Sequence, residues 1–477
     1  MRPWAFPVPL SPDSSEPLFL QITQAVSWAI QSGRLKPGAL LPGSRTLAQN
    51  LGVHRNTVLA AYRELAAEGW IQSLGRATWV MPDVPAVVAP GLGKADRPGY
   101  DLPPLPRAWD LSPPTRDLTF GGIPDPDLFP IRDLGQAFRR ALRKRSLLDR
   151  GDARGNAPLR EGLSGLLSET RGITVSPEQI VITGGSQMAL ELISRSLIRP
   201  GDRVVVEDPG YPAAWATFRH AGATLIPVSV DREGLRVDLL EALAEEGRVR
   251  AVFITPHHQY PTTVTMSATR RLRLLELAAR HRIAIVEDDY DFDFHFVGHP
   301  VMPLASRDPW GVVIYVGTLS KVLAPGLRLG FVAAPAALAE AIAFHRQMLD
   351  QNGNQVMEQA VADLLAEGLL QRHVRKMRRV YASRREALAQ ALRRHLDGTL
   401  AFDLPSGGMC IWARTGPGVD LEDWSDRARS RGLELRPGRA FDFHGQPRGG
   451  LRLGFSHLSE DNARRAVRIM AETLRRS

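Results

Sequence analysis

Short runs of β-branched and aliphatic residues alternate with amphipathic helical patterns through the centre of this 477-residue chain. The runs are IVIT at 180–183, VVVED at 204–208, AVFIT at 251–255, IAIVED at 283–288 and VVIYVG at 312–317. Because parallel strands need crossover connections, usually helices, this alternation predicts an α/β domain with a mostly parallel sheet and helices on both faces. Ligands of such sheets bind at the carboxyl ends of the strands, so we expect a functional site there.

Residues 1–82 show the period of helices three times and then the period of strands. A first amphipathic helix is predicted from Leu18 to Gly33. Ser44 is expected to cap a second helix, which Gly52 closes, and a third helix begins near His54. The segments WIQSL and ATWVM then predict two strands joined by a tight turn. This order is typical of a winged helix-turn-helix, whose third helix enters the major groove of DNA.

Polar side chains near the start of the third helix point away from its apolar stripe. Arg55, Asn56 and Thr57 are placed there and can contact base edges and phosphates. Arg45 opens the second helix, and Arg76 lies at the tip of the wing, where an arginine suits phosphates or a narrow minor groove. Two alternatives remain open: these residues form a solvated basic face, or the head binds protein rather than DNA.

The stretch GRLKPGALLPGSRTLAQNLGVHRNTVLAAYRELAAEGWIQSLGRATWV resembles the GntR-type winged helix almost end to end. The resemblance implies that double-stranded promoter DNA is a partner. It also implies that the matching positions contact DNA here, and these are Arg45, Arg55, Asn56, Thr57, Gly75 and Arg76.

A linker is predicted between this head and the α/β domain. Residues 83–114 are rich in Pro, Gly and Ala and show neither a helical nor a strand period, which indicates a flexible, partly extended tether. Lysine and arginine number 60 against 51 aspartate and glutamate, a formal net charge of +9. This charge is compatible with an acidic partner such as nucleic acid but does not require one.

The cysteine content and the hydrophobic runs limit the class of protein. The single cysteine, Cys410, excludes an intrachain disulfide and a cysteine-rich metal site and fits a reducing cytoplasm. We expect no metal site. No uncharged apolar run reaches the roughly 18 residues that a membrane span needs, and prolines interrupt the apolar residues of the N-terminus, unlike in a secretory signal. The expected location is the cytoplasm, without a membrane partner.

Three groups of polar residues follow predicted strands of the α/β domain. The glycine turn at 184–187 presents amides at a helix N-terminus, which can bind an anion. Asp288 ends a buried strand, where a carboxylate can keep a pyridine nitrogen protonated. Lys321 follows another buried strand near Arg328, and burial beside a cation lowers a lysine pKa and makes the amine nucleophilic toward aldehydes. Each group also has an ordinary interpretation: a tight connection, a capping acid and a surface lysine.

From about Leu118 to the C-terminus the chain resembles a fold-type-I aminotransferase, and the joined arrangement resembles the MocR subfamily of GntR regulators. The segments that carry the resemblance follow in the order of that subfamily: LTFGGIPDPDLFP, ITGGSQMAL, VEDPGYP, TPHHQYPT, VEDDYDFDF, GTLSKVLAPGLRLG and LRLGFS. The resemblance implies a winged helix-turn-helix at 1–82, the linker at 83–114 and an effector domain at 115–477. This effector domain has a smaller C-terminal α+β subdomain from about 345 to 477.

The resemblance also implies a site for pyridoxal 5'-phosphate (PLP). Lys321 would form a Schiff base with PLP, Asp288 would pair with the pyridine nitrogen, and Arg452 would bind a carboxylate of the substrate or effector. Tyr211 would stack on the ring, and Tyr290 would hydrogen-bond the ring hydroxyl. The phosphate would be held by Ser186, Gln187, Thr318, Ser320 and Arg328. The full set for the cofactor is Gly185, Ser186, Gln187, Tyr211, Tyr260, Asp288, Tyr290, Thr318, Ser320, Lys321 and Arg328.

One segment departs from true aminotransferases, which carry an asparagine before Pro-Thr-Gly at the ring hydroxyl. Here Tyr260-Pro261-Thr262-Thr263 has neither that asparagine nor the glycine. The tyrosine agrees with the regulatory subfamily. Since loss of the asparagine hydrogen bond disturbs the electronic tuning of the cofactor, we expect PLP binding with at most weak transaminase activity.

The leading hypothesis is a PLP-dependent transcriptional regulator. It would bind promoter DNA through the winged helix and sense an amine, an amino acid or PLP itself at Lys321. Cofactor sites of this fold lie at a subunit interface, so the resemblance implies a homodimer. The alternative hypothesis, motivated by the intact lysine and aspartate, is a metabolic PLP-dependent aminotransferase with a vestigial DNA-binding head.

Overall fold

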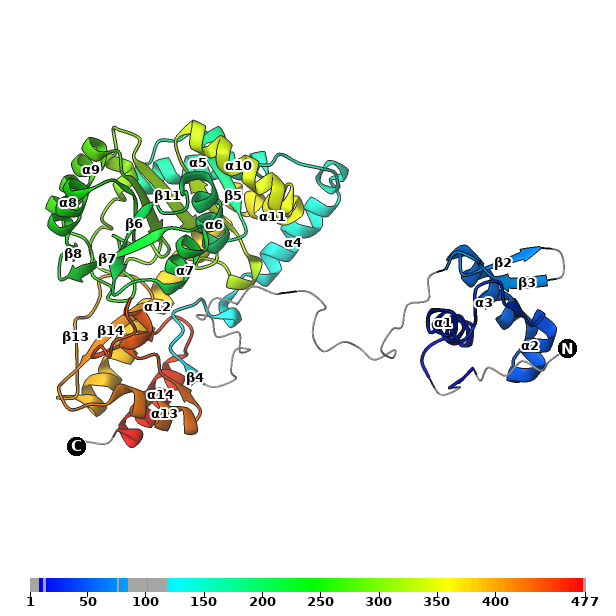
Figure 1. Ribbon diagram of the computed structural model, residues 1–477. Coiled ribbons are helices and arrows are strands. Elements are labelled where there is room, and N and C mark those ends of the chain that lie inside the picture. Colours follow the sequence, from blue (N-terminus) through cyan, green and yellow to red (C-terminus); the bar gives the residue numbers. More distant parts are fainter. Residues whose placement is uncertain (1–7, 12–13, 75–76, 85–100, 102–117, 475–477) are drawn as a thin grey trace. The chain divides into compact units, whose positions relative to one another are not determined.

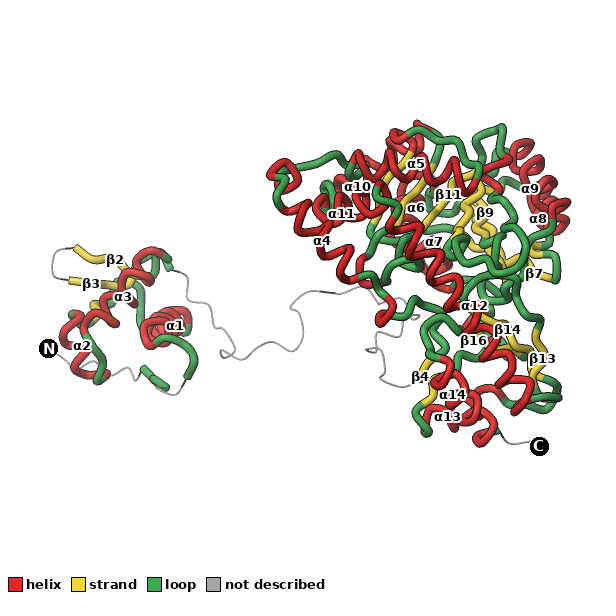
Figure 2. The backbone as a smooth tube through the Cα atoms, turned by 180° about the vertical axis from the view of Figure 1, so that it is seen from behind, coloured by secondary structure: helices red, strands yellow, loops and turns green. Residues whose placement is uncertain are grey.

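The computed structural model describes residues 8–11, 14–74, 77–84, 101 and 118–474. The chain divides into two compact units, Met1–Arg107 and Ala108–Ser477, which Figures 1 and 2 show from opposite sides. Most of the linker predicted for 83–114 lies outside the described residues, and so do Gly75 and Arg76 of the predicted wing tip.

The N-terminal unit combines three helices with a small antiparallel sheet. Its elements are α1 (Leu18–Gln31), α2 (Ser44–Leu51), α3 (Arg55–Ala67), β1 (Leu40–Leu41), β2 (Ile71–Leu74) and β3 (Ala77–Val80). The apolar faces of the helices meet in one core, in which Ile22, Leu47 and Val58 have no exposed surface. Strand β3 lies between β1 and β2 in the sheet. The predicted winged helix-turn-helix is therefore confirmed.

Two details of this head differ from the sequence expectation. Ser44 does not cap α2, because Gly43 is the N-cap residue and Ser44 is already helical. The Ser44 hydroxyl instead accepts a hydrogen bond from Nε of Arg55 at 3.4 Å, which joins α2 to α3. The turn before α2 also contains β1, whose two residues are too few to show a strand period in the sequence. At the other end of α2, Gly52 adopts the left-handed conformation that closes the helix as predicted.

The C-terminal unit is built on an eight-stranded sheet of order β5-β12-β11-β10-β9-β6-β7-β8. The strands are β5 (Ile180–Thr183), β6 (Arg203–Asp208), β7 (Thr224–Asp231), β8 (Gly234–Leu235), β9 (Val249–Ile254), β10 (Ala284–Asp289), β11 (Val313–Thr318) and β12 (Gly330–Ala333). Each of the five predicted strands is present. Strands β12 and β8 run antiparallel to their neighbours, and the pairs from β11 through β7 are parallel.

Helices cover both faces of this sheet, as the ribbon in Figure 1 shows. They are α4 (Ile131–Leu142), α5 (Ala157–Arg171), α6 (Ser186–Leu197), α7 (Pro212–His220), α8 (Val237–Glu246), α9 (Ala268–His281), α10 (Ala336–Asp350) and α11 (Gln355–Ala366). On one face, α6, α7 and α10 pack against Val204 and Val206 of β6. On the other face, α8 and α9 pack against Val205, while α4, α5 and α11 cover β5 and β12. Alternate residues of each buried strand thus face opposite layers.

A smaller subdomain follows the long helix α12 (Leu369–Leu396), whose second half belongs to its core. It contains the sheet β13-β14-β16 and two further helices: β13 (Leu400–Phe402), β14 (Cys410–Thr415), β16 (Gly450–Gly454), α13 (Leu421–Ser430) and α14 (Glu460–Thr473). Strand β4 (Leu118–Thr119), which precedes the large sheet in the chain, pairs in parallel with β15 (Leu433–Glu434). The first described strand of the C-terminal unit therefore belongs to the smaller subdomain.

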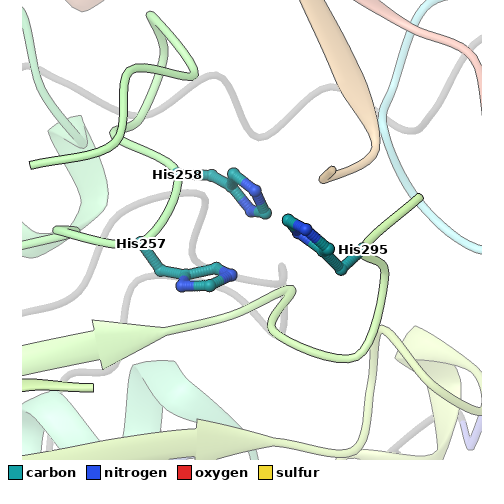
Figure 3. A group of neighbouring side chains, drawn as sticks. All are labelled: His257, His258 and His295. Carbon is teal, nitrogen blue, oxygen red and sulfur yellow. The ribbon is translucent and has the colours of Figure 1, made fainter. Parts of the chain in front are cut away.

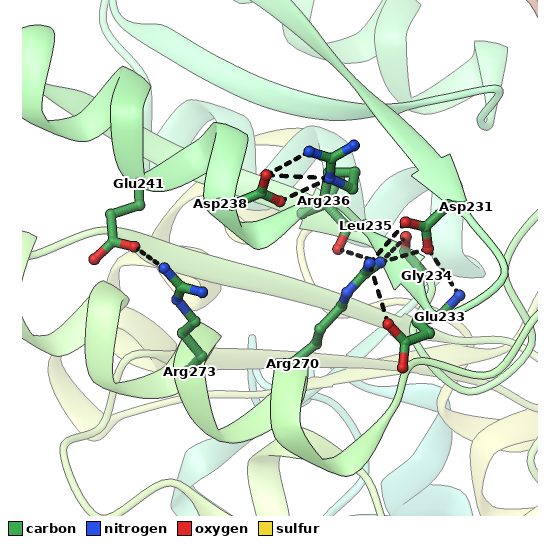
Figure 4. Close-up of polar contacts among 9 residues, drawn as sticks. All are labelled: Asp231, Glu233, Gly234, Leu235, Arg236, Asp238, Glu241, Arg270 and Arg273. Carbon is green, nitrogen blue, oxygen red and sulfur yellow. Dashed lines mark hydrogen bonds and ion pairs between the residues drawn. The ribbon is translucent and has the colours of Figure 1, made fainter.

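Charged side chains hold the far edge of the large sheet. Arg270, in the first turn of α9, donates to both carboxylate oxygens of Asp231 at 2.6 and 2.7 Å (Figure 4). The same guanidinium donates to the carbonyls of Gly234 and Leu235 in β8. These contacts satisfy backbone acceptors of the edge strand β8, whose two residues are buried.

The fold class expected from the sequence, a winged helix-turn-helix followed by an α/β domain with a mainly parallel sheet, is confirmed. Across the described residues, none of the helices combines the length and the apolar character needed to cross a membrane.

Candidate cofactor site

The carboxyl ends of neighbouring strands bring most of the predicted cofactor residues together. Strand β5 ends at the turn into α6, β10 ends at Asp289, and β11 ends three residues before Lys321. A cavity of about 210 Å³ lies there, lined by Phe120, Gly121, Tyr211, Tyr260, Lys321, Arg436 and Arg452. Because Arg452 comes from β16, the cavity lies between the large sheet and the smaller subdomain.

Lys321 points into this cavity. Its Nζ donates to the carbonyl oxygen of Gly122 at 3.3 Å. Burial, and next the positive charge of Arg452, lower the pKa of Lys321. A lowered pKa increases the fraction of neutral amine near pH 7, which is the form that attacks an aldehyde.

Asp288 is a buried carboxyl group that lacks a partner. It lies on β10 with 4% of its surface exposed, and its Oδ1 makes no hydrogen bond within the described part of the chain. Burial, and next the charge of Asp289, raise the pKa of Asp288 to about 7, while Lys321 acts in the opposite direction. A buried carboxylate without a partner is costly, so this site favours a ligand with a proton donor or a positive charge at that position.

The N-terminus of α6 and the guanidinium of Arg328 form a second group of hydrogen-bond donors. Gly185 precedes α6 with a φ of 90°, and a Cβ atom at this residue would lie 3.3 Å from the guanidinium of Arg328. Arg328 itself has a φ of 50°, which is uncommon for a residue with a side chain. Within residues 118–474 and the described part of the head, the buried hydroxyl of Ser320 has no hydrogen-bond partner. Helix amides, a guanidinium and a free hydroxyl are groups that bind phosphate.

Aromatic rings and Arg452 complete the walls of the cavity. The rings of Tyr211 and Tyr260 meet edge to face with 5.1 Å between their centroids. The guanidinium of Arg452 lies over the Tyr260 ring, with Cζ 4.5 Å from the centroid. Arg452 is 8% exposed, and its Nε has no hydrogen-bond partner among the residues that the structure describes, so an anionic ligand is the group that would satisfy it.

Three predicted cofactor residues use their side chains within the protein. The side-chain amide of Gln187 donates to Oγ1 of Thr217 at 2.7 Å and to a carbonyl oxygen of α7. The hydroxyl of Tyr290 donates to the carbonyl oxygen of His258 at 2.9 Å. The hydroxyl of Thr318 accepts from the backbone amide of Ser320 at 3.1 Å. These contacts position the loops around the cavity.

In the head, the predicted DNA contacts lie on the first turns of α2 and α3. Arg45, Arg55 and Asn56 are exposed, and Thr57 is half-buried. The ring of His54 caps α3 by accepting a hydrogen bond from the backbone amide of Asn56 at 3.2 Å. The start of α3 therefore presents exposed polar side chains, as a DNA-reading helix does.

Known proteins resemble both units. Residues 18–80 match the family described as bacterial regulatory proteins, gntR family, and residues 117–470 match aminotransferase class I and II. The chain is 33% identical over 473 residues to the probable rhizopine catabolism regulatory protein MocR of Rhizobium meliloti. The aligned residues cover 96% of this chain and 94% of that protein. The chain belongs to the MocR-type regulators of the GntR family.

The C-terminal unit of this MocR-type regulator also resembles enzymes. It is 36% identical over 362 residues to aromatic-amino-acid aminotransferase 1 of Thermococcus litoralis, covering 74% of this chain and 87% of that enzyme. The solved structure of the multiple substrate aminotransferase from Thermococcus profundus superposes with a TM-score of 0.70 at 34% identity, over 76% of this chain and 92% of that chain. Domains of the aminotransferase class I and II family typically bind PLP.

The segment that departs from aminotransferases has an unusual backbone in this MocR-type regulator. Thr263 stands where aminotransferases carry a glycine, and it adopts a φ of 62°. This left-handed conformation suits glycine and strains a β-branched residue. Thr263 thus holds a backbone conformation here that a glycine would adopt without strain.

Sequence reasoning missed two side chains near this loop, those of His258 and Asp291. His258 and Asp291 are each 3% exposed and lie 2.7 Å apart between Nδ1 and Oδ1. The available signal was the adjacent histidine pair in TPHHQYPT, which served only to support the family resemblance.

Proposed function

We propose that this MocR-type regulator binds PLP at Lys321 and uses the loaded site to sense an amine, an amino acid or PLP itself, thereby controlling the binding of its winged helix to promoter DNA. One observation carries the proposal. Among the described residues, three buried polar groups at or next to this cavity have no hydrogen-bond partner: Oδ1 of Asp288, the hydroxyl of Ser320 and Nε of Arg452. Arg452 lines the cavity together with Lys321, Ser320 precedes Lys321 in the chain, and the charge of Lys321 acts on Asp288.

These groups fit PLP because each one matches a different part of the cofactor. Asp288 would face the protonated ring nitrogen, Ser320 and Arg328 the phosphate, and Lys321 the aldehyde. When bound, PLP supplies an aldehyde carbon to which amines add and a ring that withdraws electrons from their α-carbon. Burial keeps the pKa of Lys321 low, so the neutral amine is available at that position.

Arg452 would select effectors that carry a carboxylate. Its guanidinium is fixed over the Tyr260 ring, and it presents a planar pair of donors to the cavity. Two parallel hydrogen bonds to a carboxylate are stronger and more directional than one. Amino acids should therefore bind better than the corresponding amines.

The segment Phe120–Gly122 offers a route from the cavity toward the head. Phe120 and Gly121 line the cavity, and the Gly122 carbonyl accepts from Lys321. A Cβ atom at Gly122 would lie 3.0 Å from the guanidinium of Arg452, so this segment packs closely against both ligand-binding side chains. The same segment continues through β4 into the chain that leads to the head. A ligand that changes contacts at Lys321 or Arg452 thus acts directly on this segment.

The active form would be a homodimer that reads two half-sites. Helix α10 supports this part of the proposal, because Phe344, Met348 and Leu349 expose 59%, 66% and 48% of their surfaces. Large apolar side chains grouped on one helix are typical of an interaction surface. Sedimentation equilibrium of the unchanged chain and of Phe344→Glu would test it, and a monomeric unchanged chain would contradict it.

The central experiment measures cofactor binding and DNA binding on the same variants. The full chain should become yellow with PLP, and Lys321→Ala should lose that absorbance band, whereas Lys376→Ala, an exposed lysine of α12, should keep it. Fluorescence anisotropy with the duplex upstream of its own gene should then show a PLP or effector response that Lys321→Ala lacks. Equal affinity for a scrambled duplex of the same length would refute the regulator, and a band retained in Lys321→Ala would refute the site.

A second candidate function is a metabolic aminotransferase, which the 36% identity to an aromatic-amino-acid aminotransferase favours. Steady-state turnover of amino donors by the full chain separates the two. Turnover in the usual enzymatic range of about 1 to 1000 per second would favour the enzyme. Turnover far below that range, together with a DNA response to the same amino donor, would favour the sensor.

A further inference from the structure

Three histidines gather beside the cofactor cavity, in a group that the proposed function does not use. His257 and His258 follow β9, and His295 follows β10. Figure 3 shows their rings turned toward a common space, and one ring nitrogen from each lies within 4.8 Å of the others. His257 and His258 are each 3% exposed, while His295 is half-buried.

The ring nitrogens of His257 and His295 have no hydrogen-bond partner in the part of the chain that the structure describes. Both nitrogens of His257 and both of His295 are buried and make no hydrogen bond within the described residues. The backbone of Val301 faces His257 and that of Val297 faces His295, but neither contact reaches hydrogen-bond geometry. Burying an imidazole nitrogen without a hydrogen-bond partner is unfavourable, so a ligand that used these nitrogens would remove that cost.

Asp291 orients the ring of His258. Its Oδ1 lies 2.7 Å from Nδ1 of His258, so the other nitrogen of His258 is left for a ligand. A carboxylate on the outer nitrogen of a histidine is the usual support of a metal-binding histidine, because it fixes the tautomer and makes the ring more basic. Two glycines close the site from the side of β14: a Cβ at Gly407 would lie 2.8 Å from Nε2 of His258, and one at Gly408 would lie 3.0 Å from Asp291.

We propose that His257, His258 and His295 bind one divalent transition-metal cation, most suitably Zn²⁺, with water as the fourth ligand. Three imidazoles and an open position form a known tetrahedral zinc arrangement, with Zn–N distances of about 2.0 to 2.1 Å. These distances require nitrogens about 3.4 Å apart, so the rings close inward from their present limit of 4.8 Å when the ion binds. Mg²⁺ and Ca²⁺ prefer oxygen ligands and do not match this set.

Charged groups of both signs surround the three histidines. Arg271 acts on His257 and Arg378 acts on His295 with positive charge, while the carboxylate of Asp291 lies 2.7 Å from His258. Asp291 is the negative charge in direct contact with the group, and it would attract a divalent ion.

The ion would tie together segments that lie far apart in the sequence. His257 and His258 belong to the loop after β9, and His295 belongs to the loop after β10. His295 also pairs through its backbone with Gly407, which precedes β14 of the smaller subdomain. The cation would thus fix the smaller subdomain against the edge of the large sheet. This role does not depend on PLP, although Tyr290 connects the two sites through its bond to the His258 carbonyl.

The test uses the full chain without a histidine tag, stripped with a chelator and titrated with Co²⁺, a spectroscopic substitute for Zn²⁺. We expect one Co²⁺ per chain, an intense visible spectrum of tetrahedral type, and displacement by Zn²⁺. His295→Ala should lose this spectrum, and Asp291→Asn should weaken binding about 10- to 100-fold. The exposed His395 of α12 provides the control, since His395→Ala should bind like the unchanged chain.

Two results would overturn the proposal. One is a metal-free chain that binds no Co²⁺ or Zn²⁺ at micromolar concentrations. The histidines would then be ordinary buried side chains that form hydrogen bonds to nearby backbone carbonyls. The other is an unchanged stoichiometry and spectrum in His295→Ala. Because His295 is half-buried, its alanine variant should fold, and far-ultraviolet circular dichroism checks this. Lys321→Ala should still bind the metal, so failure of the PLP proposal and failure of the metal proposal give different results.

Discussion

Replacing Asp288 by asparagine should stabilise the cofactor-free chain and weaken its binding of PLP. Asp288 is buried, and its pKa is raised to about 7 from a reference value of 3.8. Charged neighbours act on Asp288 as well. Asp289, Asp291 and Glu207 disfavour its ionised form, and Lys321 favours that form. A shift of about three pKa units corresponds to about 4 kcal/mol of destabilisation once the carboxyl group is ionised.

The sign follows from proton linkage. An acid whose pKa is higher in the folded state than in the unfolded state keeps its proton longer on folding, so stability falls as the pH rises from about 4 to about 7. Asparagine has the same shape as the protonated acid and removes this loss. The side-chain amide of the new asparagine would be buried at position 288 without a hydrogen-bond partner, which costs about 1 to 3 kcal/mol. The net gain in the free energy of unfolding should therefore be about 1 to 3 kcal/mol at pH 8, declining as the pH is lowered towards 4.

Urea unfolding of the cofactor-free chain, followed by near-ultraviolet circular dichroism at pH 5 and pH 8, measures this gain. A titration with PLP, followed by its absorbance, measures the opposite effect, because an amide cannot balance a protonated ring nitrogen. The reasoning is refuted if Asp288→Asn is no more stable than the unchanged chain at pH 8. It is equally refuted if the gain is as large at pH 5 as at pH 8.

Four shorter predictions address other residues. Arg452→Gln should raise the pKa of Lys321, because the positive charge of Arg452 lowers that pKa. Stopped-flow absorbance should then show slower PLP association at pH 7 and a pH–rate profile displaced to higher pH. Gly185→Ala should cost about 1 to 2 kcal/mol of stability for a side chain at positive φ and weaken PLP binding in an equilibrium titration, since the new methyl group crowds the anion pocket. Thr263→Gly should raise the free energy of unfolding by up to about 1 kcal/mol, because it removes a strain of about 1 to 2 kcal/mol and adds the smaller entropy cost of glycine. A lower stability in urea would contradict this. Arg55→Ala should weaken binding to specific and scrambled duplexes alike and reduce the slope of log affinity against log salt by about 1, as measured by anisotropy.

Hydrophobic periodicity predicted the helices of the head and the central strands. The stripe Val58, Ala61, Tyr62 and Leu65 is the buried face of α3 as expected. Such stripes are informative because one helix has to bury one face against its neighbours. The central strands were equally readable, since strands covered by helices on both sides become continuous apolar runs.

The elements that sequence reasoning missed are those that a local pattern cannot reveal. Strand β12 is four residues long, begins with Gly330 and runs antiparallel between two parallel strands. Strand β7 contains Pro227 and lies near the sheet edge, so it breaks the usual strand composition. Both are defined by their partners in the sheet rather than by their own residues.

The candidate cofactor site followed from family motifs more than from physical chemistry. Lys321 and Asp288 could be proposed from their positions after buried strands, but Arg452 is more than a hundred residues away in the chain, and only the fold brings it to the same cavity. The histidine group was overlooked for the same reason, because His295 joins His257 and His258 only after β9 and β10 pair. Contacts of this kind depend on sheet order, which the sequence pattern leaves open.

The position of Phe120–Gly122 has a thermodynamic consequence. This segment touches Lys321 and Arg452 and leads, through β4, to the chain that carries the head. If a ligand at the cavity changes the affinity for DNA by some factor through this segment, DNA must change the affinity for that ligand by the same factor, because the coupling free energy is shared. The promoter would then act as an effector of the PLP domain, and a ligand affinity measured without DNA would describe only one of the two linked equilibria.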